Sequence, residues 1–363
     1  MRVVTFGEVM LRLAPEGFLR LRQALPGRLE ATFGGGELNV AVSVAVQGGR
    51  SAFLTCVPDN VVTDALIQEM RKLRVDTELV IRRPQGRFGI YFVENGANQR
   101  SGTVTYDRDG SSIAGCTALD FDWDTAFRDA TWFHITGITP AISAGAAEAA
   151  VAAVQAAKRL GLHVSCDLNF RKKLWKWKSG VSAESLAQAT MPRLVPFVDL
   201  VIANEEDADL ALGIRSAATN VEAGTLHVAG YTDVARQIVK RFANVRMVAI
   251  TLRESISASH NNWGGLLFDA ASDRAVLAPC DASGQYRPYE IRNIVDRVGA
   301  GDSFAAALIF ALGTPGLDSP ETALRYAVAA SCLKHSMLGD FNYATRTEIE
   351  ELMRGAGSGR VQR

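Results

Sequence analysis

The chain has 363 residues, and 48% of them are hydrophobic, which is enough to bury one large α/β domain or two smaller ones. Lys plus Arg and Asp plus Glu both number 39, so no overall charge favours nucleic acid or an anionic membrane. The five cysteines lack C-x-x-C spacing and the five histidines lack metal-ligand spacing, which favours buried thiols and argues against structural zinc.

Strand and helix patterns alternate from the N-terminus to Ile81. The predicted segments are strands Arg2–Phe6 and Val9–Leu13, helix Asn39–Val46, strand Ser51–Val57, helix Val62–Leu73 and strand Thr77–Ile81. This alternation is typical of a parallel sheet covered by helices.

The pattern changes between Gly86 and Arg108. Two strands, Arg87–Glu94 and Gly102–Tyr106, follow one another with only the polar turn region Asn95–Asn98 between them. We predict an antiparallel hairpin outside the main sheet.

The alternation returns after Thr131. The predicted strands are Trp132–Thr136, His163–Asp167, Leu200–Ala203, Met247–Thr251 and Ile291–Val295, and the helices are Ala144–Leu160, Ala183–Leu194, Asp233–Phe242 and Ser303–Leu312. A doubly wound, mainly parallel sheet is the expected architecture, with Gly355–Arg363 as a loose tail.

Polar or glycine-rich residues follow six of the predicted strands. Because ligands of open α/β sheets bind beyond the carboxyl ends of the strands, we expect one shared site there. The segments are Gly7-Glu8, Thr136-Gly137, Asp167–Arg171, Asn204–Asp207, Thr251–Glu254 and Asp296-Arg297.

A second glycine-rich feature joins the predicted strand ending at Val295 to the apolar helix that follows. Gly299, Ala300 and Gly301 form a tight corner whose free N–H groups, with the helix dipole, suit a phosphate. Asp302 either caps this helix or faces the same ligand. Near the N-terminus, Gly34–Gly36 precede Asn39, which reads as a glycine turn with a capping residue or as another ligand site.

The two glycine segments resemble motifs of the ribokinase-like, or phosphofructokinase-B, sugar kinases. These are D-x-x-G-A-G-D-x-F at Asp296–Phe304 and G-G-x-x-N at Gly35–Asn39. The resemblance implies one kinase domain over residues 1–363, with a small β-sheet lid formed by about 9–33 and 86–110. It implies Asp302 as catalytic base, Gly299, Ala300 and Gly301 as anion hole, and Gly35 and Asn39 as sugar contacts. Lids of this family often pair, so we expect a homo-oligomer.

The same resemblance implies ATP and Mg²⁺ as cofactors. Asn204 and Asp207 offer oxygens for a hydrated Mg²⁺. The family has Asn-x-x-Glu here, so we expect the shorter Asp207 to act through water. No G-x-x-x-x-G-K-[ST] occurs, which excludes a P-loop kinase. The nucleotide candidates are Asn204, Thr251, Arg253, Gly301 and Lys334.

Two nucleotide features stay open. Thr251–Ser255 replaces the Lys-x-Gly strand end of many relatives and is followed by the polar Ser257–Trp263, so the adenine pocket is not assigned. Lys334–Phe341 is a candidate for the second wall of the adenine pocket. Asp296 either binds a monovalent cation or caps the turn.

Within the family the chain most resembles 2-keto-3-deoxygluconate kinases, through segments such as Gly7–Leu13, Tyr106–Ser111 and Cys166–Trp175. A planar guanidinium binds a carboxylate through two parallel hydrogen bonds, which a neutral hexose cannot offer. The alternative is that Arg108 pairs with Asp107 or Asp109 and Arg171 with a surface acid. The implied substrate contacts are Gly35, Asn39, Tyr91, Tyr106, Arg108, Ile138 and Arg171.

The sequence therefore predicts a cytoplasmic, ATP-dependent kinase acting on the terminal hydroxyl of a sugar acid, 2-keto-3-deoxygluconate, with no nucleic-acid or membrane partner. The N-terminus becomes polar too early for a signal peptide. A kinase for a neutral sugar such as fructose or ribose, and a sugar-binding regulator without turnover, are the alternatives. A Rossmann oxidoreductase is weaker, because no G-x-G-x-x-G follows the first strand.

Overall fold

The computed structural model describes residues 1–204, 206–216 and 228–355. The predicted tail beyond Gly355 and Glu205 of the Asn204–Asp207 segment lie outside these residues. Within the described ranges, no helix is both long and apolar enough to cross a bilayer.

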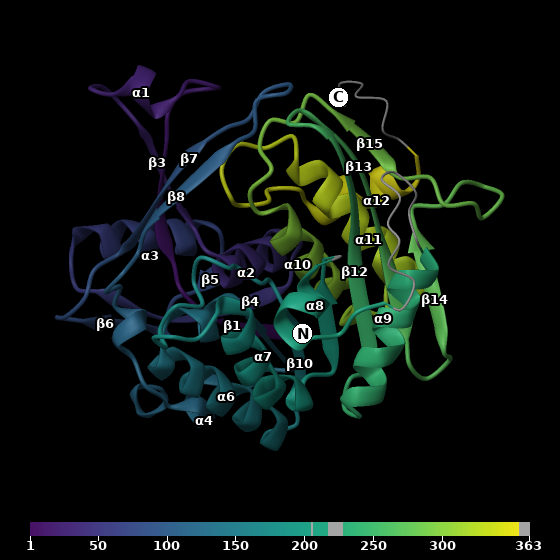
Figure 1. Cartoon of the computed structure of the whole chain (residues 1–363), viewed down its shortest axis with the longest axis horizontal. Helices are drawn as coiled ribbons and strands as arrows, with labels where there is room; N and C mark the ends of the chain where they lie inside the picture. The colour runs from purple at the N-terminus through teal and green to yellow at the C-terminus, as the bar shows by residue number, and fades with distance from the viewer. Residues whose placement is uncertain (205, 217–227, 356–363) are drawn as a thin grey trace.

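Eleven strands of the described chain form the main sheet, in the order β14-β13-β12-β11-β10-β9-β1-β4-β5, with β15 beside β13 and β6 beside β4 (Figure 1). From β12 to β5 all neighbours are parallel, whereas β13 runs antiparallel to β12, β14 and β15. The bounds are β1 Arg2–Phe6, β4 Arg50–Pro58, β5 Val75–Asp76, β6 Val80–Arg83, β9 Trp132–Thr136, β10 His163–Asp167, β11 Leu200–Ala203, β12 Met247–Ser257, β13 His260–Asp269, β14 Arg274–Ala278 and β15 Tyr289–Arg292.

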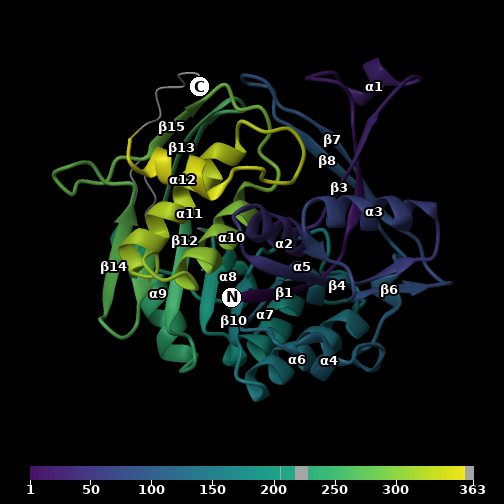
Figure 2. The same cartoon turned by 180° about the vertical axis from the view of Figure 1, so that it is seen from behind.

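Helices cover both faces of this sheet, as the predicted doubly wound fold requires. One face, turned to the viewer in Figure 2, carries α2 Gly36–Val46, α3 Val61–Lys72, α10 Ala300–Leu312, α11 Pro320–Lys334 and α12 Arg346–Met353. The other carries α4 Trp123–Ala126, α5 Ile138–Ile142, α6 Ala144–Arg159, α7 Ala183–Leu194, α8 Asp207–Leu212 and α9 Val228–Arg241. Short 3-10 turns occupy Ile113–Gly115, Ala118–Asp120 and Val195–Phe197.

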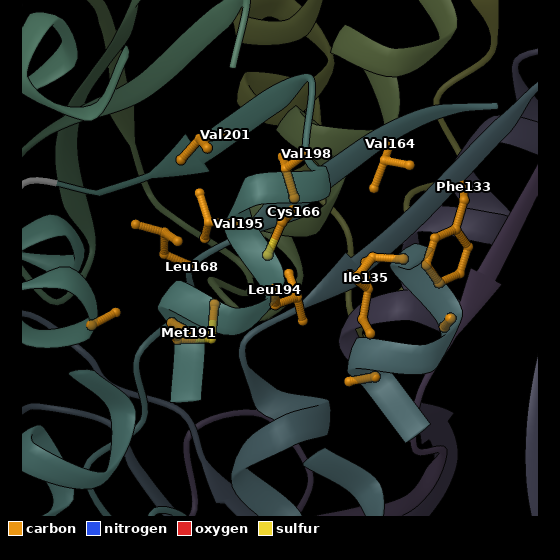
Figure 3. Packing of buried hydrophobic residues seen from close by; sticks show 14 of the residues in the cluster. Phe133, Ile135, Val164, Cys166, Leu168, Met191, Leu194, Val195, Val198 and Val201 are labelled. Carbon is orange, nitrogen blue, oxygen red and sulfur yellow. The ribbon is translucent and has the colours of Figure 1, made fainter. Parts of the chain in front are cut away.

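The core is divided by the alternation of side chains along each strand. Phe133 and Ile135 of β9 and Cys166 of β10 belong to the cluster beneath α6 and α7, part of which Figure 3 shows. Neighbours of opposite parity, such as Trp132, pack instead with α10 and α11. A parallel sheet buried on both faces explains why these strands are apolar throughout.

A separate sheet, in the order β3-β2-β7-β8, projects from the main one at the upper left of Figure 1. Its strands are β2 Met10–Ala14, β3 Glu30–Gly34, β7 Gly89–Glu94 and β8 Thr103–Asp107, with the short helix α1 Leu21–Ala24 between β2 and β3. The predicted antiparallel hairpin is confirmed as β7 and β8.

The hairpin tip reaches the tip of the long β12–β13 ribbon. The Asn98 carbonyl accepts a hydrogen bond from the Ala258 N–H at 2.7 Å, and the Asn98 N–H donates to Ser259 Oγ at 2.9 Å. The small sheet therefore contacts the main sheet at the β7–β8 turn, through hydrogen bonds to the β12–β13 turn.

Two strand predictions were wrong. The run Ile291–Val295 is not a parallel strand: β15 ends at Arg292, because Asn293 adopts a left-handed conformation and the Asp296 carboxylate then accepts the Val298 N–H in a turn. Thr77–Ile81 is interrupted because Asp76 accepts the Glu78 N–H, which separates β5 from β6.

Candidate active site

A cavity of about 360 Å³ lies at the carboxyl ends of the parallel strands, beside the small sheet. It collects most of the residues that the sequence singled out. The predicted residues that line it are Gly35, Asn39, Tyr91, Tyr106, Ile138, Arg171, Asn204, Asp207, Thr251, Arg253, Gly299, Ala300, Gly301 and Asp302.

The first turn of α10 forms one wall of the cavity. This helix begins at Ala300, earlier than the predicted Ser303, with Gly299 as N-cap at φ 82°. A side chain on Gly299 would adopt a strained backbone and collide with the Asp340 carbonyl, whereas Gly301 faces open space. The first-turn N–H groups lack intrahelical acceptors, so this turn can hold an anion.

Asp302 projects from the same turn and meets Asn39 of α2. Its Oδ2 accepts a hydrogen bond from Asn39 Nδ2 at 2.6 Å. Burial raises the pKa of Asp302 from 3.8 to about 6, although the Asn39 hydrogen bond acts in the opposite direction. The carboxylate is therefore ionised at neutral pH and more basic than a free aspartate, as a general base requires.

Replacing Asn39 by leucine is expected to move the acid limb of kcat/KM to higher pH. In the wild type that limb should lie near the Asp302 pKa of about 6. Removing a donor to the charged carboxylate favours its protonated form, so the pKa rises further. Rates measured between pH 5 and 9 test this, and an unmoved limb would show that Asn39 does not tune the base.

Gly35 is fixed by packing as the N-cap of α2. A side chain there would collide with the Glu8 carbonyl, and Asn39, inside the helix, accepts the Gly35 N–H at 3.3 Å. The interpretation of Asn39 as a helix cap is therefore wrong, because Gly35 holds that position. The Asn39 amide is directed to the cavity and to Asp302.

Two buried carboxylates face Arg171 on another side of the cavity. Burial raises the pKa of Asp167 well above its usual range, and the pKa of Asp207 is raised for the same reason. Arg171 lowers both pKa values through its charge but forms no ion pair within the described ranges. Its guanidinium donates to the Phe170 carbonyl at 3.3 Å and remains accessible to a ligand.

Asp207 is better suited to contact a metal ion through water than to bind it directly. Its Oδ1 accepts the Phe170 N–H at 3.0 Å and its Oδ2 accepts the Asn204 N–H at 3.1 Å, which fixes the carboxylate at the start of α8. The described residues contain no group of three or more His, Cys, Asp or Glu that could hold a metal. The donor set thus fits Mg²⁺ carried by phosphates and contacted through water.

Asp296 is already engaged beneath the anion-binding turn. Arg12 of β2 donates to Asp296 at 2.5 Å and to Asp340 at 2.8 Å, and all three side chains are almost fully buried. Asp296 also accepts the N–H groups of Val298 and Gly339. These contacts favour the capping role over the monovalent cation, because Arg12 and the nearby buried Lys334 already face the two carboxylates.

Arg108 and Lys334 depart from the prediction, since neither lines the cavity. Arg108 is buried and pairs with Glu8, not with Asp107 or Asp109, and its Cζ lies 5.6 Å from the Tyr106 ring centroid. Lys334 is fully buried and donates to the Met337 carbonyl at 3.1 Å. The partner of Arg108 is distant in sequence, and the partner of Lys334 lies on the turn that follows α11. Neither contact could be predicted from the sequence motifs.

The cavity also contains polar residues from segments that the sequence analysis named as candidates. Asp167, Asn169 and Arg297 come from the strand-end segments, and His335 and Asp340 from the candidate second wall Lys334–Phe341. Asn261 and Trp263, on β13, had no predicted role, and only the strand pairing shows that they share a face.

The model of the pfkB family carbohydrate kinases matches residues 1–252 of this chain. The chain belongs to the pfkB family of carbohydrate kinases. It is therefore a sugar kinase, and its ribokinase-like fold is confirmed. The predicted catalytic motif lies beyond the matched residues, in α10.

Individual relatives extend the likeness over nearly the whole chain. A 2-dehydro-3-deoxygalactonokinase of Haloferax volcanii is 30% identical over 359 residues, 98% of each chain. The solved 2-dehydro-3-deoxygluconokinase of Thermotoga maritima has a TM-score of 0.86 and 39% identity over 98% of this chain and 100% of its own. An Escherichia coli protein provisionally assigned as a ribokinase II, solved with ATP and Mg²⁺, shares the fold at 20% identity and a TM-score of 0.74 over 98% of this chain and 99% of its own.

Proposed function

We propose that this sugar kinase transfers the γ-phosphoryl group of ATP to the terminal hydroxyl of 2-keto-3-deoxygluconate, giving 2-keto-3-deoxy-6-phosphogluconate. The observation that carries the choice of an acid is Arg171, a guanidinium on the cavity without an ion pair in the described part of the chain. The Haloferax and Thermotoga relatives, both named for 2-dehydro-3-deoxy sugar acids, support the same choice.

In this mechanism Asp302 takes the proton of the attacking hydroxyl. Its raised pKa and its place in the first turn of α10 suit that role. The N–H groups of Gly299, Ala300 and Gly301 stabilise the charge that develops on the transferred group. Mg²⁺, brought with the nucleotide, would balance the phosphate charge, with Asp207 and Asn204 orienting its waters.

The substrate carboxylate would lie against Arg171, with Gly35, Asn39 and Ile138 around the sugar. The rings of Tyr91 and Tyr106, tilted by 32° with centroids 6.1 Å apart, would form the side of the sugar site that the small sheet provides. Arg108 does not contact the substrate in this arrangement, and its role is to position the Tyr106 ring beside which it lies. The small sheet closes the site as a lid, and dimerisation through it remains a prediction.

The direct experiment is a coupled ADP-release assay with ATP and Mg²⁺. The panel contains 2-keto-3-deoxygluconate, its galactonate epimer, gluconate, fructose and ribose. A preference for either keto-deoxy acid supports the carboxylate contact, and the epimer decides the stereochemistry. A preference for fructose or ribose would replace the proposed substrate, and no turnover on any compound would favour a regulator.

Arg171→Ala is expected to raise KM for the acid roughly tenfold or more, because a charge-assisted pair contributes about 1.5–3 kcal/mol. KM for ATP should change much less. Lys172→Ala is the matched control, since Lys172 is exposed and pairs with Glu184. If instead KM for ATP rises and that for the acid does not, Arg171 serves the phosphates.

A further inference from the structure

Glu37 joins two walls of the cavity without lining it. It lies in the first turn of α2, beside Gly36 and two residues before Asn39, and both of these neighbours line the cavity. The Glu37 side chain is 0% exposed and extends from α2 to the end of β9. Neither the phosphoryl transfer nor the substrate contacts described above use this buried acid.

Three donors from the turn between β9 and α5 converge on one oxygen of Glu37. Its Oε1 accepts hydrogen bonds from the Thr136 N–H at 3.1 Å, from Thr136 Oγ1 at 2.8 Å and from Thr139 Oγ1 at 2.8 Å. Thr136 Oγ1 in turn accepts the Ile138 N–H at 3.1 Å. Ile138, which lines the cavity, is therefore held to α2 through Glu37.

Gly36 shows how closely the two walls approach each other. A Cβ at this position would lie 3.5 Å from Thr136 Cγ2, 3.8 Å from Ile138 Cδ1 and 3.5 Å from Asp302 Oδ1. The α2 backbone, Ile138 and Asp302 thus meet within van der Waals range. A displacement of α2 by about 1 Å would change both the space beside Ile138 and the approach to Asp302, and such misplacements cost on the order of 10²-fold in rate.

We propose that Glu37 is a positioning residue for the sugar substrate, which holds the α2 turn with Gly35 and Asn39 at a fixed distance from Ile138. This inference deepens the proposed function and rests on it, because it takes these residues as the sugar contacts. All three donors to Glu37 are neutral and share one oxygen, so the acid supplies an acceptor and its charge is not required.

Glutamine should therefore replace Glu37. Burial raises the pKa of Glu37 to about 7, although the hydrogen bonds from Thr136 and Thr139 act in the opposite direction. The neutral carboxyl group is thus well populated at neutral pH, and a glutamine amide keeps the same acceptor oxygen. Leucine has a similar size but no acceptor, and it leaves the two threonine hydroxyls and the Thr136 N–H without their partner.

Steady-state kinetics of the full-length protein test the proposal, with 2-keto-3-deoxygluconate and ATP varied in turn. Glu37→Leu should raise KM for the acid roughly tenfold or more, while KM for ATP stays within about threefold. Glu37→Gln should keep both constants within about threefold of the wild type. Rates are measured well below the melting midpoint of each variant, so that loss of folded protein does not contribute.

Thr139→Val provides a second test that leaves α2 unaltered. It removes one donor to Glu37 and should raise KM for the acid roughly threefold. Thr190→Val is the matched control, because Thr190 is also a buried helical threonine, on α7, and its hydroxyl donates to the Leu186 carbonyl at 2.8 Å. It should leave KM for the acid unchanged. If Glu37→Leu does not fold, this pair of variants decides the question.

A purely structural Glu37 would give lower melting temperatures in Glu37→Leu and Thr139→Val with unchanged KM for the acid, which would overturn the proposal. An equal rise in KM for ATP would also overturn it, and so would a Glu37→Gln variant as impaired as Glu37→Leu, because the charge would then be needed. Failure of the proposed substrate would appear separately, as a wild type that turns over fructose or ribose but not the acid.

Discussion

Asp302→Asn is expected to lower kcat by on the order of 10²-fold or more, because the amide cannot accept the hydroxyl proton. KM for ATP should change far less, since the N–H groups of the α10 turn remain. The measurement is steady-state turnover at saturating ATP and sugar at pH 8. Asp64→Asn, an exposed aspartate in the first turn of α3, serves as the control and should retain full turnover.

The same variant should not lose stability. Since burial raises the pKa of folded Asp302 to about 6, its ionised form opposes folding, progressively from about pH 4 to pH 6 and fully above that. Asp302→Asn should therefore melt at an equal or higher temperature at pH 8, with no gain at pH 4. Near-normal turnover in this folded variant would falsify the base assignment, whereas a large loss of stability would leave Asp302 with a structural role.

The glycine motifs were visible in the sequence, although only part of the reason for them is local. Gly299 needs a left-handed backbone, which is a local demand, whereas the carbonyls of Asp340 beside Gly299 and of Glu8 beside Gly35 belong to distant parts of the chain. A ligand approaching Gly301 and Asp302 uses groups within one helical turn. Such features leave a short signature that does not depend on knowing the rest of the fold.

The electrostatic partners were not predictable, because they depend on residues far apart in the chain. Arg108 lies beside acids in sequence but pairs with Glu8, about a hundred residues away. Likewise Asn261 and Trp263 on β13 belonged to a polar segment that gave no sign of a buried strand. Only the pairing of β12 with β13 shows which of them share a face.

Glu37 illustrates the same limit in the first turn of α2, which begins at Gly36, before the predicted start at Asn39. It is fully buried, with a pKa raised by burial to about 7, and its Oε1 accepts hydrogen bonds from Thr136 and Thr139. A side chain on Gly7 would collide with this carboxyl group. The glycine after the first strand therefore makes room for a group that ties α2 to the end of β9, which the sequence alone could not reveal.

Arg12→Leu is expected to destabilise the fold by about 3–5 kcal/mol, because it removes the ion-pair partner of the buried Asp296 and Asp340 and leaves only Lys334 to face both carboxylates. Both carboxylates raise the pKa of Arg12 above its usual range, so the pair is ionised in the folded protein. Urea unfolding at pH 7.5 measures the loss. Arg82→Leu, which breaks exposed contacts to Asp59 and Asp64, is the control and should cost no more than about 1 kcal/mol.

A double variant separates charge from packing. Arg12→Leu combined with Asp296→Asn removes one charge of each sign, so Lys334 and Asp340 remain as opposite buried charges and part of the lost stability should return. It should not recover activity, because Asp296 shapes the turn before Gly299 and Asp340 packs against it. If Arg12→Leu alone costs no more than the surface control, the buried cluster does not hold the small sheet to the anion-binding turn.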